Sequence, residues 1–334
     1  MMRWAALLLA ALVGLAAPAD AAEKVRVGLL KFSTNGPTFI ALDKGYFAAE
    51  GLDVSLVYFD AAQPIAVAAV SGDIDIGVTG VAAGFYNLAG KGALAIIAAQ
   101  SREEPGYPNN GILVSNHAWD AGLQSYKDLG GHSVAVTTVG SPTHYAIAIL
   151  AEKVGIPLDS IRIVPMQTNS NQVSALAGGQ VDVGVIPVTL ALPLLERKEA
   201  HLLGWAGDVA PWQLGGIFVK KSMIAEHRPL LEAYLRAYRR AAHEFYDAFL
   251  VKGPDGKPHQ GPGAPALLDI LAKYLGQKPE QIEQGIAFVD PDGRLLVKDI
   301  DRQIAWYQAH GMVDKSVDPA SILDLSFVEG HYQK

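Results

Sequence analysis

Gly72-Asp-Ile-Asp-Ile-Gly-Val78 and Gly179-Gln-Val-Asp-Val-Gly-Val185 are two versions of one motif, 107 residues apart. Two further pairs repeat at nearly the same offset: Pro37-Thr38 with Pro142-Thr143, 105 residues later, and Gly51-Leu52 with Gly155-Ile156, 104 residues later. Three correspondences in the same order indicate two copies of one βαβ lobe, each with its own sheet. Two such lobes leave a cleft between them, which is a favoured place for a small ligand.

Around this motif, strand-like and helix-like stretches alternate, which predicts an α/β fold with a parallel-rich sheet in each lobe. Strands are expected at residues 25–30, 52–59, 74–78 and 93–99, and helices at 38–44 and 64–70. After Trp212 a strand at 216–220 is followed by helices at 229–250, 266–275, 279–284 and 298–310. Apolar positions recur every three to four residues in the long helix, so this helical tail is expected to pack back onto the first lobe.

The predicted organisation is a signal peptide at 1–22, a first lobe at 23–114, a second lobe at 115–214, and a return to the first lobe at 215–334. Arg3 precedes an apolar run from Ala5 to Ala17, and Ala19-Asp20-Ala21 has the small-x-small pattern of a cleavage site near Ala21. Thirteen apolar residues are too few to span a bilayer, although a retained anchor is the alternative. The mature chain is therefore predicted to be exported to the periplasm.

Composition excludes several classes of protein. The 334 residues include 27 Lys and Arg against 34 Asp and Glu, a net charge of −7 with no basic run, which argues against a nucleic-acid partner. Half of the residues are hydrophobic, so a mostly disordered chain is excluded. The absence of cysteine excludes disulfides, thiolate zinc sites and cysteine nucleophiles. No cofactor or metal is expected.

Several longer motifs resemble the substrate-binding proteins of ABC importers, in the nitrate/sulfonate/taurine and thiamine-precursor group. The resemblance is carried by the segments 44–54, 71–78, 128–136, 140–144, 177–182 and 216–219. It implies a two-lobed periplasmic binding protein of type II that closes on a small molecule. It also implies delivery of that molecule to an ABC permease with a cytoplasmic ATPase. We further expect a monomer without enzymatic activity. Some relatives in the thiamine-precursor branch are pyrimidine synthases with a cysteine-rich motif, a role that this cysteine-free chain cannot share.

Three other interpretations, a hydrolase, a phosphate-binding loop and a zinc site, have less support in the sequence than a binding protein. Ser141 and His144 are close in sequence, but Ser141 lacks the Gly-x-Ser-x-Gly elbow of a hydrolase. The stretch 84–92 has the wrong glycine spacing for a phosphate loop, and the histidines lack the paired spacing of zinc ligands. Three alternatives to the transport receptor stay open: a sensing protein that partners a signalling receptor, a binder of a thiamine-precursor pyrimidine, and an exported enzyme.

The ligand is expected in the cleft, against segments that follow strand ends and helix N-termini. Helices starting near Gly36 and Ser141 would both aim N–H groups at the cleft, which favours an anion. Arg102 could add a bidentate clamp, and aliphatic and aromatic neighbours favour a small organic anion such as a sulfonate or carboxylate. Closure is expected to bend the crossings at 109–116 and 206–215. The predicted site residues are Ser33, Thr34, Asn35, Thr79, Arg102, Ser141, Thr143, His144, Gln167, Asn169, Thr189 and Trp212.

Overall fold

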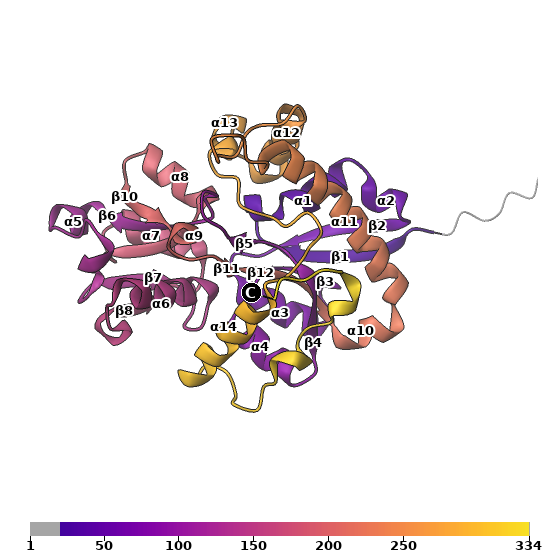
Figure 1. Cartoon of the computed structure of the whole chain (residues 1–334), viewed down its shortest axis with the longest axis horizontal. Coiled ribbons are helices and arrows are strands. Elements are labelled where there is room, and N and C mark those ends of the chain that lie inside the picture. The colour runs from indigo at the N-terminus through magenta and orange to yellow at the C-terminus, as the bar shows by residue number, and fades with distance from the viewer. Residues whose placement is uncertain (1–20, 334) are drawn as a thin grey trace, which may run out of the picture.

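The computed structural model of the protein describes residues 21–333. The predicted signal peptide lies outside the described residues, apart from Ala21 and Ala22. Two five-stranded sheets form two lobes side by side, and a small two-stranded sheet lies between them (Figure 1). The predicted fold class is confirmed.

The first lobe contains a mixed sheet with the strand order β2-β1-β3-β12-β4. β1 is parallel to β2 and to β3, whereas β12 is antiparallel to both of its neighbours. The five strands are β1 (Glu23–Leu29), β2 (Leu52–Tyr58), β3 (Ile76–Gly80), β4 (Leu94–Ala99) and β12 (Gly215–Lys220).

The second lobe repeats this arrangement, with the order β8-β7-β9-β6-β10. β7 is parallel to β8 and to β9, and β6 takes the antiparallel position that β12 takes in the first lobe. The strands are β6 (Asn110–Ser115), β7 (Ser133–Val136), β8 (Arg162–Pro165), β9 (Val183–Pro187) and β10 (Ala200–Trp205). The two copies of the sequence motif lead into β3 and β9, which occupy equivalent places in the two sheets.

The helices cover the faces of the two sheets and form the C-terminal tail. They are α1 (Gly36–Asp43), α2 (Tyr46–Ala49), α3 (Ala62–Ser71), α4 (Ala83–Gly90), α5 (Asn116–Asp120), α6 (Pro142–Val154), α7 (Asn169–Ala177), α8 (Val188–Glu196), α9 (Ala206–Val209), α10 (Lys221–Glu226), α11 (Arg228–Phe249), α12 (Ala264–Leu275), α13 (Pro279–Glu283) and α14 (Val297–Ala309).

The chain crosses between the lobes through two short strands that pair with each other. β5 (Arg102–Glu103) lies on the outward crossing and β11 (Trp212–Gln213) on the return, and they are antiparallel. β6 pairs with β9 and β10 in the second sheet. The boundary that the sequence predicted after residue 114 therefore falls inside β6, a strand of the second sheet. We propose the same division into lobes, with the first crossing ending before Asn110.

The C-terminal tail packs against both lobes. The apolar face of α11, which includes Leu231, Tyr238 and Phe245, is buried in one core with β1 and α1, as predicted. α14 also contacts the second lobe, because the hydroxyl of Tyr307 donates to the Ser141 carbonyl at 3.2 Å. Within residues 21–333, no helix is both long and apolar enough to cross a membrane.

Candidate functional site

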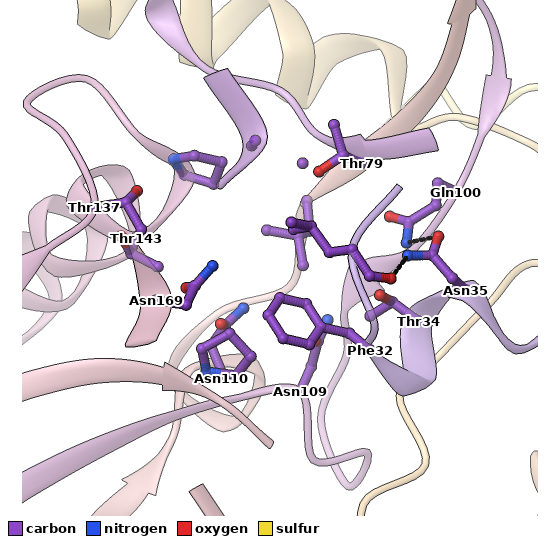
Figure 2. Close-up of a pocket in the computed structure, with 16 residues that line it drawn as sticks. Phe32, Thr34, Asn35, Thr79, Gln100, Asn109, Asn110, Thr137, Thr143 and Asn169 are labelled. Carbon is purple, nitrogen blue, oxygen red and sulfur yellow. Dashed lines mark hydrogen bonds between the residues drawn. The ribbon is translucent and has the colours of Figure 1, made fainter. Parts of the chain in front are cut away.

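A small pocket of about 60 Å³ lies between the lobes, where strands of both sheets end. Figure 2 shows Thr143 and Asn169 of the second lobe on one side of this pocket and Thr34, Asn35 and Gln100 of the first lobe on the other. The lining comprises Leu30, Phe32, Thr34, Asn35, Ala62, Thr79, Gly80, Gln100, Asn109, Asn110, Thr137, Pro142, Thr143, Asn169, Pro187 and Leu214.

Five helices begin at the pocket. Ala62, Pro142 and Asn169 are the first residues of α3, α6 and α7, and they line the pocket. Asn35 and Pro187, which directly precede α1 and α8, line it as well. The N-terminus of a helix carries roughly half a positive charge and unpaired N–H groups. Helix dipoles from both lobes therefore favour negative charge in the pocket.

The side chains of the lining are neutral. Among the lining residues that the structure describes, none is Asp, Glu, Lys, Arg or His, and the polar members are four threonines, four asparagines and one glutamine. Hydroxyl and amide groups can donate hydrogen bonds without bringing a charge of their own. The pocket thus combines many donors with no carboxylate, an arrangement that suits an anion.

Two polar atoms of this lining are buried and have no hydrogen-bond partner within residues 21–333. They are Oγ1 of Thr79 and Nδ2 of Asn109. A buried polar group without a partner costs about 1–3 kcal/mol, and in a native protein such a group calls for a functional explanation. Both atoms are hydrogen-bond donors that belong to residues lining the pocket.

The amides of the first lobe are held in fixed orientations. Asn35 donates through Nδ2 to the Leu30 carbonyl at 2.8 Å, and its Oδ1 accepts from Nε2 of Gln100 at 3.1 Å (Figure 2). Oε1 of Gln100 in turn accepts from Ser101 Oγ at 2.7 Å. This chain of bonds also assigns the oxygen and nitrogen of each amide, so the donors are positioned before a ligand arrives.

The lobes are in contact around the pocket. The backbone N–H of Ser33 donates to Thr189 Oγ1 at 3.1 Å, and Nδ2 of Asn169 donates to the Asp60 carbonyl at 2.9 Å. On another side, the N–H of Ala83 donates to the Gly140 carbonyl at 2.8 Å. Each of these bonds joins a residue of the first lobe to one of the second, so the structure shows the closed arrangement.

Seven of the twelve predicted site residues lie in or beside the pocket. Five line it: Thr34, Asn35, Thr79, Thr143 and Asn169. Ser33 and Thr189 form one of the interlobe bonds at its edge.

Ser141 and His144 do not line the pocket. Their side chains accept hydrogen bonds from backbone N–H groups at the start of α6. Ser141 Oγ accepts from the His144 N–H at 3.3 Å as the helix cap, and His144 Nδ1 accepts from the Gly140 N–H at 3.0 Å. Burial, together with the nearby His310, lowers the pKa of His144 to about 4. The imidazole is therefore neutral at pH 7, and its structural role is to fix the turn before α6.

The remaining three predicted residues do not line this pocket. Arg102 lies over the rings of Phe288 and Tyr332, and its Nε donates to Glu104 at 2.8 Å. The structure therefore does not place the expected clamp at the pocket. Gln167 is exposed in a turn. Trp212 is buried edge-on against Tyr145, whose ring centre is 5.4 Å away.

Four polar residues of the lining were missed by the sequence reasoning. Gln100 and Thr137 are the first residues after the buried strands β4 and β7. A polar residue directly after a buried strand could have been predicted to face the cleft. Asn109 and Asn110 were assigned to the hinge alone, although a hinge segment that crosses between lobes also passes the cleft.

Removal of the Thr79 hydroxyl is expected to lower the affinity for the ligand without lowering the stability of the unliganded protein. Thr79→Val is expected to weaken the binding of an anionic ligand roughly tenfold or more, because a hydrogen bond to a charged group contributes about 1.5–3 kcal/mol. The unliganded protein should be at least as stable, since a buried unpartnered hydroxyl is removed. Thr38→Val is the matched control, because Thr38 is also a fully buried threonine of the first lobe but does not line the pocket. Calorimetric titration and chemical denaturation of both variants would test this, and equal affinity loss in both would contradict it.

Solved structures with the same fold come from several bacteria. The alkanesulfonate-binding protein SsuA of Xanthomonas axonopodis pv. citri, bound to MOPS, is 20% identical with a TM-score of 0.73, over 91% of this chain and all of that one. The periplasmic aliphatic sulphonate binding protein SsuA of Escherichia coli is 18% identical with a TM-score of 0.69, over 93% and 96%. The periplasmic nitrate-binding protein NrtA of Synechocystis PCC 6803 is 14% identical with a TM-score of 0.72, over 91% and 86%.

The sequence comparisons agree at the level of the family. No curated protein sequence matches the chain. A family profile described as NMT1/THI5 like matches residues 34–248, which include the repeated motif, both crossings and all of the pocket lining except Leu30 and Phe32. Because this match covers well over half of the chain, the protein belongs to the NMT1/THI5-like family.

Proposed function

We propose that this protein is the periplasmic solute receptor of an ABC importer and that it captures a small organic anion, a sulfonate or a carboxylate, between its lobes. The observation that carries the proposal is the pocket itself, where five helix N-termini and neutral donors from both lobes converge without a carboxylate. Such a site stabilises negative charge through dipoles and hydrogen bonds. The solved structures of similar fold that bind alkanesulfonates and nitrate support the same ligand class.

The pocket supports binding in preference to catalysis. None of its described lining residues titrates near neutral pH, and the Ser141–His144 pair is engaged in helix capping. A nucleophile or general base would need a titratable group within reach of the ligand. The function as a receptor therefore requires no chemical step, only closure and release.

The size of the pocket favours a small ligand. A bound water needs about 10–15 Å³ measured in the same way, so 60 Å³ holds roughly four to six water-sized groups. An anionic head group with a short organic body fits this volume. Delivery to a membrane permease with a cytoplasmic ATPase, export to the periplasm and a monomeric state complete the proposal.

A thermal-shift screen tests the ligand class. A ligand that binds only the folded protein is expected to raise the free energy of unfolding by about 2.7 kcal/mol at one hundred times its Kd. The panel contains ethanesulfonate, short carboxylates, nitrate, bicarbonate and a neutral hydroxymethylpyrimidine. Stabilisation by sulfonates or carboxylates is the expected result. Stabilisation by the pyrimidine with none from the anions would overturn the anionic ligand and leave a receptor for a neutral one.

A further inference from the structure

A fully buried carboxyl group lies at the hinge, next to the pocket. Glu103 belongs to β5 on the outward crossing, and its backbone pairs with Trp212 of β11 on the return crossing. Gly207 of the return crossing also packs against this segment, since a Cβ atom there would lie 2.8 Å from the backbone N and O of Glu104. A residue that pairs one connection between the lobes with the other is placed to sense their relative movement.

The same carboxyl group holds a side chain of the pocket. Nδ2 of Asn110 donates to Oε1 of Glu103 at 2.6 Å, and Asn110 lines the pocket. Oε2 of Glu103 is buried without a hydrogen-bond partner among the described residues. The carboxyl is therefore separated from a bound ligand by a single side chain, and one of its oxygens carries no compensating donor.

The charged groups around Glu103 do not neutralise it. Asp208 of α9 is acidic, and on the same strand Arg102 pairs with Glu104. β6 and β11 contribute no charged residue, and Asp299 of α14, which faces β11, is paired with Arg302. Burial, reinforced by Asp208, raises the pKa of Glu103 to about 8. The carboxyl group is therefore mostly neutral at pH 7.

We infer that Glu103 is a positioning residue through which a proton controls anion capture: the neutral carboxyl permits an anion in the pocket, and the ionised carboxyl opposes it. The inference rests on the proposed function. An ionised Glu103 places an uncompensated buried charge beside the ligand and draws the Asn110 amide toward itself. Because the effect is reciprocal, a bound anion favours the protonated carboxyl.

The affinity for an anion is expected to depend on pH with a defined sign. Below pH 8 the carboxyl already holds its proton, and the affinity is flat. Above pH 8, binding must take up one proton, so the affinity falls up to tenfold per pH unit. Ethanesulfonate is a suitable probe, because its sulfonate stays ionised over the whole range and any pH dependence comes from the protein.

Titration calorimetry with ethanesulfonate from pH 6 to 9.5 tests the inference. In the native protein the affinity is expected to fall above pH 8, and titrations at pH 9 in two buffers of different ionisation enthalpy should show uptake of up to one proton per ligand. Glu103→Gln, which cannot ionise, should lack this fall and bind roughly tenfold or more tightly than the native protein at pH 9.5. Glu226→Gln, which removes an exposed carboxylate of α10 outside the pocket, is the matched control and should follow the native curve.

The possible outcomes separate this inference from the proposed function. Tight binding that is flat with pH in the native protein overturns the role of Glu103 and leaves the receptor proposal intact. A lack of ethanesulfonate binding at every pH overturns the proposed ligand and the inference together. The buffer experiment needs only the native protein, so it decides the matter even if Glu103→Gln fails to fold.

Discussion

Replacing Asn109 with leucine is expected to weaken ligand binding by about 10- to 100-fold. Nδ2 of Asn109 is buried in the pocket lining and has no partner among the described residues, so its N–H groups are available to a ligand oxygen. A hydrogen bond to a charged group contributes about 1.5–3 kcal/mol, and that energy converts to this range of affinities. Leucine has nearly the same shape as asparagine, so the loss reports the missing donor more than a change of volume.

Stability should move in the opposite direction from affinity. Because an amide with a buried unpartnered NH2 group is replaced by an apolar isopropyl group, unliganded Asn109→Leu is expected to be at least as stable as the native protein. The backbone carbonyl of Asn109, which accepts from the Val188 N–H at 2.6 Å, is retained. Chemical denaturation measures stability, and calorimetry measures affinity. Asn116→Leu, an exposed position outside the pocket, provides the control, and a variant that loses both properties would contradict the assignment of Asn109 to the ligand.

The fold could be predicted from the sequence because its information is local and repeated. Buried strands such as β4 are short apolar runs, and the two motifs mark the same place in each lobe, so each copy supports the assignment of the other. The long helix α11 carries its apolar face in its own periodicity. These features depend on neighbours a few residues away.

The candidate site was predictable only in part, because the direction of a side chain depends on distant partners. Asn35 and Thr79 lie at strand ends beside the cleft. They could be predicted because ligands of open α/β sheets bind at the carboxyl ends of the strands. Arg102 also follows a strand, but β5 turns it toward Phe288 and Tyr332, which come from the C-terminal tail. His144 was a plausible ligand contact until the structure showed that the turn before α6 uses its ring nitrogen.

Gly140→Ala is expected to weaken ligand binding roughly ten- to hundredfold by obstructing closure. A Cβ atom at Gly140 would lie 2.8 Å from the Cβ of Ala83, which belongs to the opposite lobe. The bond from the Ala83 N–H to the Gly140 carbonyl holds the two backbones too close for either to give way easily. Overpacking of this kind costs about 1–3 kcal/mol, and it is paid only when the lobes close.

The backbone at Gly140 requires a control, because its φ of 81° is itself unfavourable for alanine. Gly155→Ala supplies it: Gly155 has a φ of 75°, and a Cβ atom there would meet nothing within 4 Å. Both variants should lose similar stability without ligand, whereas only Gly140→Ala should lose affinity and stay extended in small-angle scattering at saturating ligand. Equal affinity in the two variants would mean that the contact between Ala83 and Gly140 is not formed in the liganded state. The difference in affinity between the two variants therefore measures the cost of the interlobe contact separately from the strain of the turn. A loss confined to Gly140→Ala would show that the absence of a side chain at Gly140 allows the lobes to close on the ligand.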